Sequence, residues 1–268
     1  MHSELVYTRK GSGEPVVLIH GIGHRRQAWD PVFERLAEKY DVIAVDLAGF
    51  GESSAYPKGV PYDMATACDN LADNFEAWGV HRPHVVGNSL GGAISLELGA
   101  RGLVSSVTAL SPAGFFGVFN RIQTFVLLIL LRLGSLLPDG VLRAASRKAW
   151  ARKAIGMSLY THPERFTAEE VYGDSQALKN CTGFERTITS GITYAFTSRV
   201  DVPATIAWGT RDRILPYSSA GIAAERLPDL NHVALPNCGH VPMVDDPELI
   251  VRVIDQTVTG AKASDRAA

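Results

Sequence analysis

The order of predicted strands and helices constrains the fold of this chain more than any other feature. Short runs rich in β-branched residues alternate with longer stretches whose apolar residues recur at spacings of three and four. Strands are predicted at residues 15–20, 42–46, 84–87, 104–111, 204–209 and 232–236, and helices at 29–39, 64–78, 90–100, 218–226 and 247–257. Because parallel neighbours need crossover connections, this alternation predicts an α/β fold with a mostly parallel sheet and helices on both faces. Ligands are then expected at the carboxyl ends of the strands.

One region, residues 113–199, breaks this alternation because it contains no convincing strand. We interpret it as a helical insertion, so that residues 1–112 and 200–268 form the core domain. Its most apolar run, Ile122 to Leu131, lies between Arg121 and Arg132 and has ten uncharged residues. A bilayer span needs about 20 residues, so no transmembrane segment is predicted. A buried helical layer is the favoured interpretation of this run, and peripheral membrane contact is the alternative.

Composition excludes several classes of protein. Lys and Arg number 26 and Asp and Glu 28, so the formal net charge is −2, which argues against a nucleic-acid partner. Cys68, Cys181 and Cys238 are too scattered for a disulfide framework or a metal site. With no leader-like segment recognised at the start of the sequence, we expect a cytoplasmic protein.

The strongest chemical signal is Gly87-Asn88-Ser89-Leu90-Gly91, between a predicted strand and a predicted helix. It matches the G-x-S-x-G nucleophile elbow, in which a serine sits on a tight, strained turn flanked by residues without side chains. The following helix directs free N–H groups and the positive end of its dipole at the same place. The pattern predicts a nucleophilic serine.

A serine needs a base, and the base needs an acid to orient it. His240 follows the last predicted strand and Asp212 follows the one before it, so both are expected at the carboxyl edge of the sheet. The alternative position for the acid, residues 111–114, contains no carboxylate. His20 is expected to shape its loop, and Cys238 to be a small packing residue. The predicted catalytic order is Ser89, Asp212, His240.

These motifs together resemble the α/β-hydrolase superfamily, from His20-Gly21 to Gly239-His240. The resemblance implies a sheet of about eight mostly parallel strands, with residues 113–199 as a helical cap over the active site. It also implies an oxyanion hole formed by the backbone N–H groups of Ile22 and Leu90, with Gly23 as an alternative to Ile22. A further family-like turn begins at Asp46, which we interpret as structural.

The nucleophile narrows the expected reaction. Relatives that open epoxides or displace halide use Asp at the elbow, so Ser89 favours acyl transfer to water. Carbon–carbon bond hydrolases share the Gly-Asn-Ser-x-Gly elbow but typically place an aromatic residue after the catalytic histidine, where this chain has Val241. We therefore expect a carboxylic-ester hydrolase that needs no cofactor or metal. A C–C bond hydrolase and a non-catalytic small-molecule receptor are the alternatives.

The expected partner is a small, hydrophobic ester. The apolar character of the insertion suggests this substrate class, although helices of an insertion need apolar faces for packing in any case. Candidate substrate contacts are Trp29, Phe115, Phe116 and Met243. Each is also a residue type that is common in protein cores.

Overall fold

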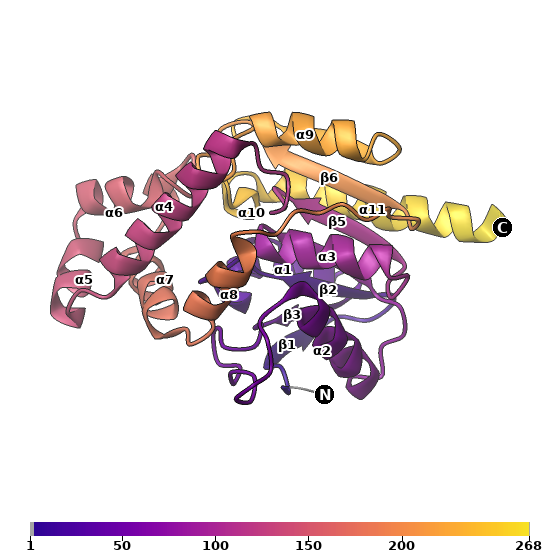
Figure 1. Cartoon of the computed structure of the whole chain (residues 1–268), viewed down its shortest axis with the longest axis horizontal. Coiled ribbons are helices and arrows are strands. Elements are labelled where there is room, and N and C mark those ends of the chain that lie inside the picture. Colours follow the sequence, from indigo (N-terminus) through magenta and orange to yellow (C-terminus); the bar gives the residue numbers. More distant parts are fainter. Residues whose placement is uncertain (1–2, 268) are drawn as a thin grey trace.

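A seven-stranded sheet forms the centre of the computed structural model, which describes residues 3–267 and side chains up to Ala261 (Figure 1). The strand order is β1-β3-β2-β4-β5-β6-β7. Only β1 is antiparallel to its neighbour within this sheet, so the predicted mostly parallel sheet is confirmed. The strands are β1 (Tyr7–Lys10), β2 (Pro15–Ile19), β3 (Asp41–Val45), β4 (His84–Asn88), β5 (Ser106–Leu110), β6 (Ala204–Gly209) and β7 (Asn231–Leu235).

The sheet has one strand fewer than the family resemblance implied. The described residues that precede β1 bond to a helix instead of adding a strand. The N–H of Ser3 donates to Asn70 Oδ1 at 2.8 Å, and the N–H of Leu5 donates to Asn74 Oδ1 at 3.0 Å. Both asparagines lie on α2 (Met64–Ala77), whose side chains therefore take the place of a strand partner.

Helices cover both faces of the sheet, as the alternation predicted. Side chains alternate along each strand, so Val17 and Ile19 of β2 point to one core cluster and Val16 and Leu18 to the other. The first cluster is covered by α2, α3 (Leu90–Ala100) and α9 (Ser218–Arg226). The second is covered by α1 (Asp30–Ala37), α10 (Pro242–Asp245) and α11 (Pro247–Ala267), together with η1 (Arg26–Trp29).

Residues 113–199, which we call the insertion, are helical between β5 and β6. Their helices are α4 (Val118–Ser135), α5 (Asp139–Ser146), α6 (Ala149–Gly156), η2 (Pro163–Arg165), α7 (Ala168–Asn180) and α8 (Phe184–Gly191). Figure 1 shows α4 to α7 projecting to one side of the sheet, with α8 closer to α3. The insertion is therefore a helical addition to the α/β core.

The helix α4 is longer than the ten-residue apolar run within it. By length and composition alone, its 18 residues would be enough to cross a membrane. Polar side chains nevertheless join it to the folded chain. Thr124 Oγ1 donates to the carbonyl of Ile214 at 2.6 Å, and Arg132 Nε donates to Glu185 Oε1 at 2.8 Å. One face of α4 is therefore held by the protein.

Candidate active site

Ser89 occupies a strained turn between β4 and α3. Its φ of +57° and ψ of −114° lie outside the regions that side-chain-bearing residues normally adopt. The turn is fixed by its neighbours, since the N–H of Ser89 donates to the carbonyl of Leu110 at 2.9 Å. The carbonyl of Ser89 accepts from the N–H groups of Ala93 and Ala113, each at 3.0 Å. Ser89 is therefore held at the carboxyl end of β4.

Two glycines make this turn sterically possible. A Cβ at Gly87 would lie 2.0 Å from the carbonyl oxygen of Gly91, and a Cβ at Gly91 would lie 2.1 Å from that of Ile19. In both cases the obstacle is backbone, which cannot swing aside. The glycines at both ends of the predicted motif are therefore required by close approach of the chain.

His240 and Asp212 form a buried pair. The two loops that carry them bond to each other, because the N–H of Arg211 donates to the carbonyl of Cys238 at 2.9 Å. Asp212 Oδ2 lies 2.8 Å from His240 Nδ1. Asp212 Oδ1 accepts from the N–H groups of Ile214 at 2.9 Å and Leu215 at 2.8 Å. The carboxylate is thus fixed by the backbone, and it orients the imidazole.

Asn88, the residue before Ser89, joins the elbow to the histidine loop. Its Nδ2 donates to the carbonyl of His240 at 2.8 Å and to that of Leu110 at 3.1 Å. No role was predicted for Asn88 from the sequence, although its place inside the motif was a usable signal. Asn88 therefore brings the backbone of His240 next to the turn that carries Ser89.

The two residues whose backbone amides are expected to form an oxyanion hole line the same cavity as Ser89. Ile22, Ser89 and Leu90 all line one cavity of about 60 Å³, which we call the nucleophile cavity. The Gly21–Ile22 turn lies close to the serine, since a Cβ at Gly21 would be 3.2 Å from Ser89 Cβ. Leu90 begins α3, so its N–H belongs to the electropositive end of that helix.

His20 helps to fix the direction of the Ile22 amide, together with the N–H of His24, which donates to the same Gly21 carbonyl at 3.2 Å. His20 Nε2 accepts from the N–H of Leu47 at 3.0 Å, which leaves Nδ1 to donate to the carbonyl of Gly21 at 2.7 Å. The C=O of Gly21 and the N–H of Ile22 belong to one trans peptide and point in opposite directions. Holding the carbonyl toward the imidazole therefore turns the N–H of Ile22 away from it. This geometry supports the loop-shaping role expected for His20.

Burial lowers the pKa of His20 from 6.5 to about 4. As the pH falls, the unfolded chain protonates His20 near pH 6.5, whereas the folded chain does so only near pH 4. The contribution of His20 to the free energy of unfolding is therefore fully present above pH 6.5 and is lost as the pH falls toward 4. We expect this one group to lower the free energy of unfolding by about 3 kcal/mol across that window. Urea unfolding at several pH values measures it. In a His20→Gln variant, the decrease in the free energy of unfolding over this pH range should be smaller by that amount. Equal decreases in the wild type and the variant would contradict the lowered pKa of His20.

Asp245 is a further buried carboxylate, and no role was predicted for it from the sequence. Its Oδ2 accepts from the N–H of Gly239 at 2.7 Å, and its Oδ1 accepts from the N–H groups of Thr161 and His162, each at 3.0 Å. The carbonyl of Leu159 also accepts from the N–H of His240 at 2.8 Å. Residues of the insertion thus hold the histidine loop directly. No motif marks this role, because it depends on contacts between distant segments.

Replacing Asp245 with Ala should lower the free energy of unfolding by about 3 kcal/mol, because it leaves the buried N–H of Gly239 and the partly buried N–H groups of Thr161 and His162 without this acceptor. The neighbouring Asp246→Ala is the matched control. Asp246 Oδ1 accepts only from the N–H of Leu249 among the described hydrogen bonds, at 2.9 Å, at the start of α11. Loss of such a cap costs about 1 kcal/mol. Chemical denaturation compares the two variants, and equal losses would contradict the role given to Asp245.

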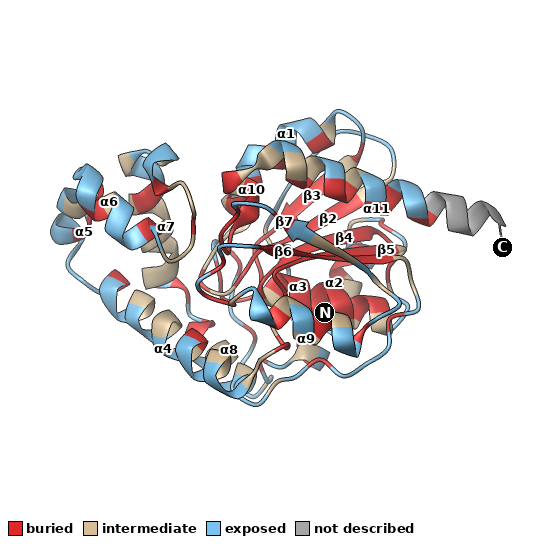
Figure 2. Cartoon of the chain, turned by 90° about the horizontal axis from the view of Figure 1, so that it is seen from above, coloured by how far each residue is buried: buried red, intermediate tan, exposed pale blue. Residues whose placement is uncertain are grey.

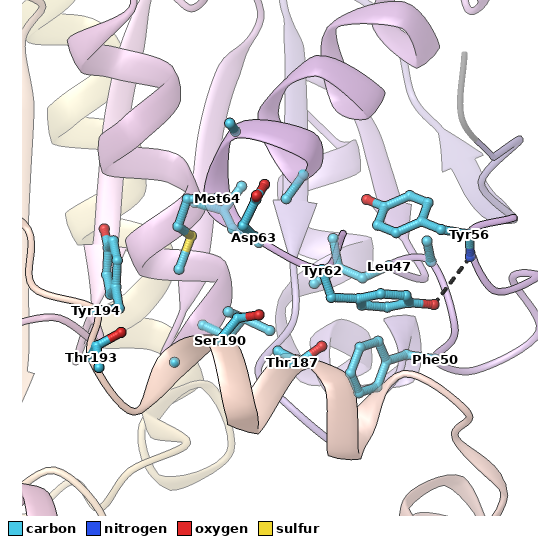
Figure 3. A pocket seen from close by; sticks show the side chains of 16 residues that line it. Leu47, Phe50, Tyr56, Tyr62, Asp63, Met64, Thr187, Ser190, Thr193 and Tyr194 are labelled. Atoms are coloured by element: carbon cyan, nitrogen blue, oxygen red, sulfur yellow. Dashed lines mark hydrogen bonds between the residues drawn. The ribbon is translucent and has the colours of Figure 1, made fainter. Parts of the chain in front are cut away.

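Two larger cavities adjoin the nucleophile cavity. The tyrosine cavity, of about 360 Å³, is lined by Phe50, Tyr56 and Tyr62 among others, and it shares Met64, Leu90, Thr187, Gly191 and Tyr194 with the nucleophile cavity. Figure 3 shows Phe50, Tyr56 and Tyr62 grouped at one end of the tyrosine cavity, Tyr194 at the other, and Thr187 and Ser190 of α8 between them. The insertion cavity, of about 410 Å³, shares Ile22 and Leu128 with the nucleophile cavity. Ser89 therefore stands between two mainly apolar chambers.

Only one of the four expected substrate contacts lines these cavities. Phe116 borders the nucleophile cavity. Trp29 and Met243 are fully buried in the core cluster beneath α1 and α11, and Phe115 packs with Phe196 and Trp208. The structure therefore places Trp29, Phe115 and Met243 in the core. The residue type alone could not separate these core positions from Phe116.

Other groups near the site have structural surroundings. Asp46 accepts from the N–H of Arg26 at 2.6 Å and from that of Glu52 at 2.9 Å, which fits the structural interpretation of its turn. Burial raises the pKa of the Cys238 thiol to about 12, so it is a poor nucleophile. Among the described residues, no group of three or more His, Cys, Asp or Glu side chains is arranged to hold a metal ion.

Comparison with known proteins extends over nearly the whole chain. A family model described as "Alpha/beta hydrolase family" matches residues 16–253. Lipase 1 of Psychrobacter immobilis is 26% identical over 97% of this chain and 80% of its own length. The 2-hydroxy-6-oxo-6-(2'-aminophenyl)hexa-2,4-dienoic acid hydrolase of Metapseudomonas resinovorans is 26% identical over 91% and 84%. The crystal structure of a membrane phospholipase A is similar with a TM-score of 0.72 and 27% identity, over 97% of this chain and 86% of that one.

Proposed function

This chain belongs to the alpha/beta hydrolase family, and on that premise we propose that it is a serine hydrolase that cleaves carboxylic esters. Ser89 is the proposed nucleophile, His240 the base and Asp212 the orienting acid. The observation that carries the proposal is the 2.8 Å contact between His240 Nδ1 and Asp212 Oδ2, on a loop joined by Asn88 to the Ser89 turn. A serine on a strained elbow, with an oriented imidazole on the loop joined to it, is the arrangement that nucleophilic acyl transfer requires.

The proposed reaction follows from these contacts. Asp212 keeps the proton of His240 on Nδ1, so Nε2 is free to accept the proton of Ser89 as Oγ bonds to the ester carbonyl carbon. The N–H groups of Leu90 and Ile22 stabilise the negative oxygen that forms. His240 then gives its proton to the leaving alcohol as the C–O bond breaks, and water hydrolyses the acyl-enzyme in the same way.

The walls of the nucleophile cavity favour an uncharged substrate. Every described residue that lines it has an uncharged side chain, and most are apolar. An uncharged ester with an apolar chain can enter without leaving a charge unpaired. Burying an ion in this cavity would be costly because none of its described lining residues carries a charge.

Carbon–carbon bond hydrolysis is the second candidate, and it is favoured by the similarity to the dienoic acid hydrolase of Metapseudomonas resinovorans. A dienoic acid carries a carboxylate, which the uncharged walls of the nucleophile cavity would not pair, although Arg152 lines the adjoining insertion cavity. Esters are therefore preferred. An assay with a 2-hydroxy-6-oxo-dienoic acid beside a neutral ester decides between the two, and faster turnover of the acid would overturn the preference.

The length of the substrate's acyl chain should govern kcat/KM. We expect kcat/KM for p-nitrophenyl esters to rise about fourfold for each added methylene, from acetate until the chain fills its chamber, because each buried methylene contributes about 0.8 kcal/mol. A negatively charged hemisuccinate ester is the control and should be a poor substrate. Equal rates for acetate and octanoate would contradict an apolar chain site.

A matched pair of variants identifies the chamber that holds the chain. Leu128 lies where the nucleophile and insertion cavities meet, and Thr187 lies where the nucleophile and tyrosine cavities meet. Leu128→Trp and Thr187→Trp should each narrow one junction. The variant that shortens the preferred chain while leaving acetate hydrolysis unchanged marks the acyl chamber. If neither variant changes the preference, the chain lies elsewhere.

A further inference from the structure

The outer face of α4 is apolar and exposed. Six of its residues, Phe119, Ile122, Val126, Ile129, Leu130 and Leu133, are between 48% and 86% exposed. We call them the outer stripe. At 3.6 residues per turn they fall within about 100° of the helix circumference, and every residue of α4 in that arc is apolar. A helix at a protein surface normally directs polar residues to this side.

Packing within the chain does not account for the outer stripe. The opposite side of α4 already provides the helix with its contacts, through Thr124 and through Leu127 and Leu131, which pack against the core cluster. Figure 2 shows that exposed residues also predominate on α5 and α6, away from the sheet. Trp150 of α6 is 75% exposed. Apolar surface of this extent generally marks a binding surface.

The distribution of charge indicates what binds there. Residues 113–199 contain 11 Lys and Arg and 6 Asp and Glu, a formal charge of +5. The rest of the chain contains 15 and 22, a formal charge of −7. The exposed side chains of Arg147 and Lys148 take part in none of the ion pairs recorded for the described residues. The apolar face of α4 and the positive charge of the insertion are complementary to a partner with an apolar interior and an anionic surface.

The outer stripe is also continuous with a route to Ser89. Leu130 belongs both to the stripe and to the wall of the insertion cavity. That cavity extends to Ile22 and Leu128, which it shares with the nucleophile cavity. An apolar molecule could therefore pass from the surface beside α4 to the nucleophile without crossing a charged barrier at the junction.

We propose that the insertion docks on anionic lipid bilayers, with the outer stripe in the interface and the basic residues of the insertion against the lipid phosphates. The binding energy has two parts. Apolar side chains leave water at the level of the headgroups, and each Lys or Arg near the surface adds an attraction that salt weakens. The proposal concerns binding and does not require that Ser89 be the nucleophile.

Sedimentation with lipid vesicles tests the proposal. The whole chain carrying Ser89→Ala is used so that hydrolysis cannot alter the vesicles. We expect it to bind vesicles containing phosphatidylglycerol at least tenfold more tightly than vesicles of phosphatidylcholine alone, with the difference reduced at high salt. Equal binding to both vesicles, or no binding to either, would overturn the proposal.

Two pairs of variants in the same background assign the surface. Phe119→Gln with Ile122→Gln should weaken binding about tenfold or more, whereas Tyr217→Gln, an exposed aromatic residue of the core domain, should not. Lys148→Glu should weaken binding to phosphatidylglycerol about tenfold, whereas Lys58→Glu in the core domain should change it little. Equal effects within either pair would overturn the assignment.

The same substitutions also separate docking from catalysis and from self-association. In the wild-type background, Phe119→Gln with Ile122→Gln should leave hydrolysis of a soluble acetate ester unchanged, since neither residue lines a described cavity. If the wild type is instead a dimer that these substitutions dissociate, a second copy of the chain covers the outer stripe and the lipid proposal fails.

Discussion

Ser89→Ala should lower kcat for a p-nitrophenyl ester by about 10⁴- to 10⁶-fold without unfolding the protein. The loss is expected to be this large because the bond-forming atom is removed, and the oxyanion donors alone provide only a residual acceleration. Alanine fits the site, since the turn is held by backbone contacts of Ser89 to Leu110, Ala93 and Ala113 that do not involve the hydroxyl. Steady-state kinetics and thermal unfolding measure the two effects.

Cys238→Ala is the matched control for this substitution. Cys238 lies two residues before His240 and is the other side chain near the site that could attack a carbonyl. Since its thiol is buried and its pKa raised, the variant should keep activity near that of the wild type. A fluorophosphonate probe should label the wild type and Cys238→Ala but not Ser89→Ala. Hydrolysis by Ser89→Ala at the wild-type rate would contradict the proposed mechanism.

The same probe distinguishes an enzyme from a receptor built on this fold. A receptor that only closes on its ligand needs no activated serine. Stoichiometric labelling of Ser89, together with turnover of any ester, is expected here. If Ser89 is not labelled and no ester is turned over, the receptor interpretation replaces the enzymatic one.

The sequence predicted those features that depend on local chemistry. The parallel sheet follows from strands alternating with helices, and the Ser89 turn follows from glycines whose absent side chains make room for backbone at 2.0 and 2.1 Å. His240 and Asp212 could be placed because parallel strands end at the same edge of the sheet. In each case the structural constraint arises within a short segment, so residues close together in the sequence indicate it.

The remaining features depend on contacts between distant segments, which leave no pattern in a single sequence. Asp245 holds Gly239 and Thr161, which are far apart along the chain. Trp29 and Phe116 are both large aromatic residues, yet only Phe116 reaches the nucleophile cavity. The ten-residue apolar run gave no indication that α4 continues through both flanking arginines. The exposed apolar face of α4 could be identified only once the structure showed which side of the helix packs on the protein.

Asp212→Asn should lower kcat by about 10⁴-fold although it replaces one oxygen with nitrogen. The reason lies in the two contacts of the carboxylate. Oδ1 accepts from the N–H groups of Ile214 and Leu215, so the amide oxygen of Asn must remain there and its NH₂ group must face His240. Two donors cannot share a hydrogen bond, so Nδ1 of His240 gives up its proton and Nε2 holds it instead. The base is then in the wrong tautomer to accept the proton of Ser89.

The contacts to Ile214 and Leu215 also make this variant informative, because Asn preserves them and the protein should stay folded. Asp212→Ala, in contrast, should also lose stability, since it leaves two buried N–H groups without an acceptor. Asp229→Asn, at an exposed position of the core domain, is the control for the loss of one negative charge and should keep full activity. The kinetics of all three variants are compared with their melting temperatures. If Asp212→Asn retains more than about a tenth of the wild-type kcat, the tautomer of His240 is set by some other group and Asp212 is not the third member of the triad.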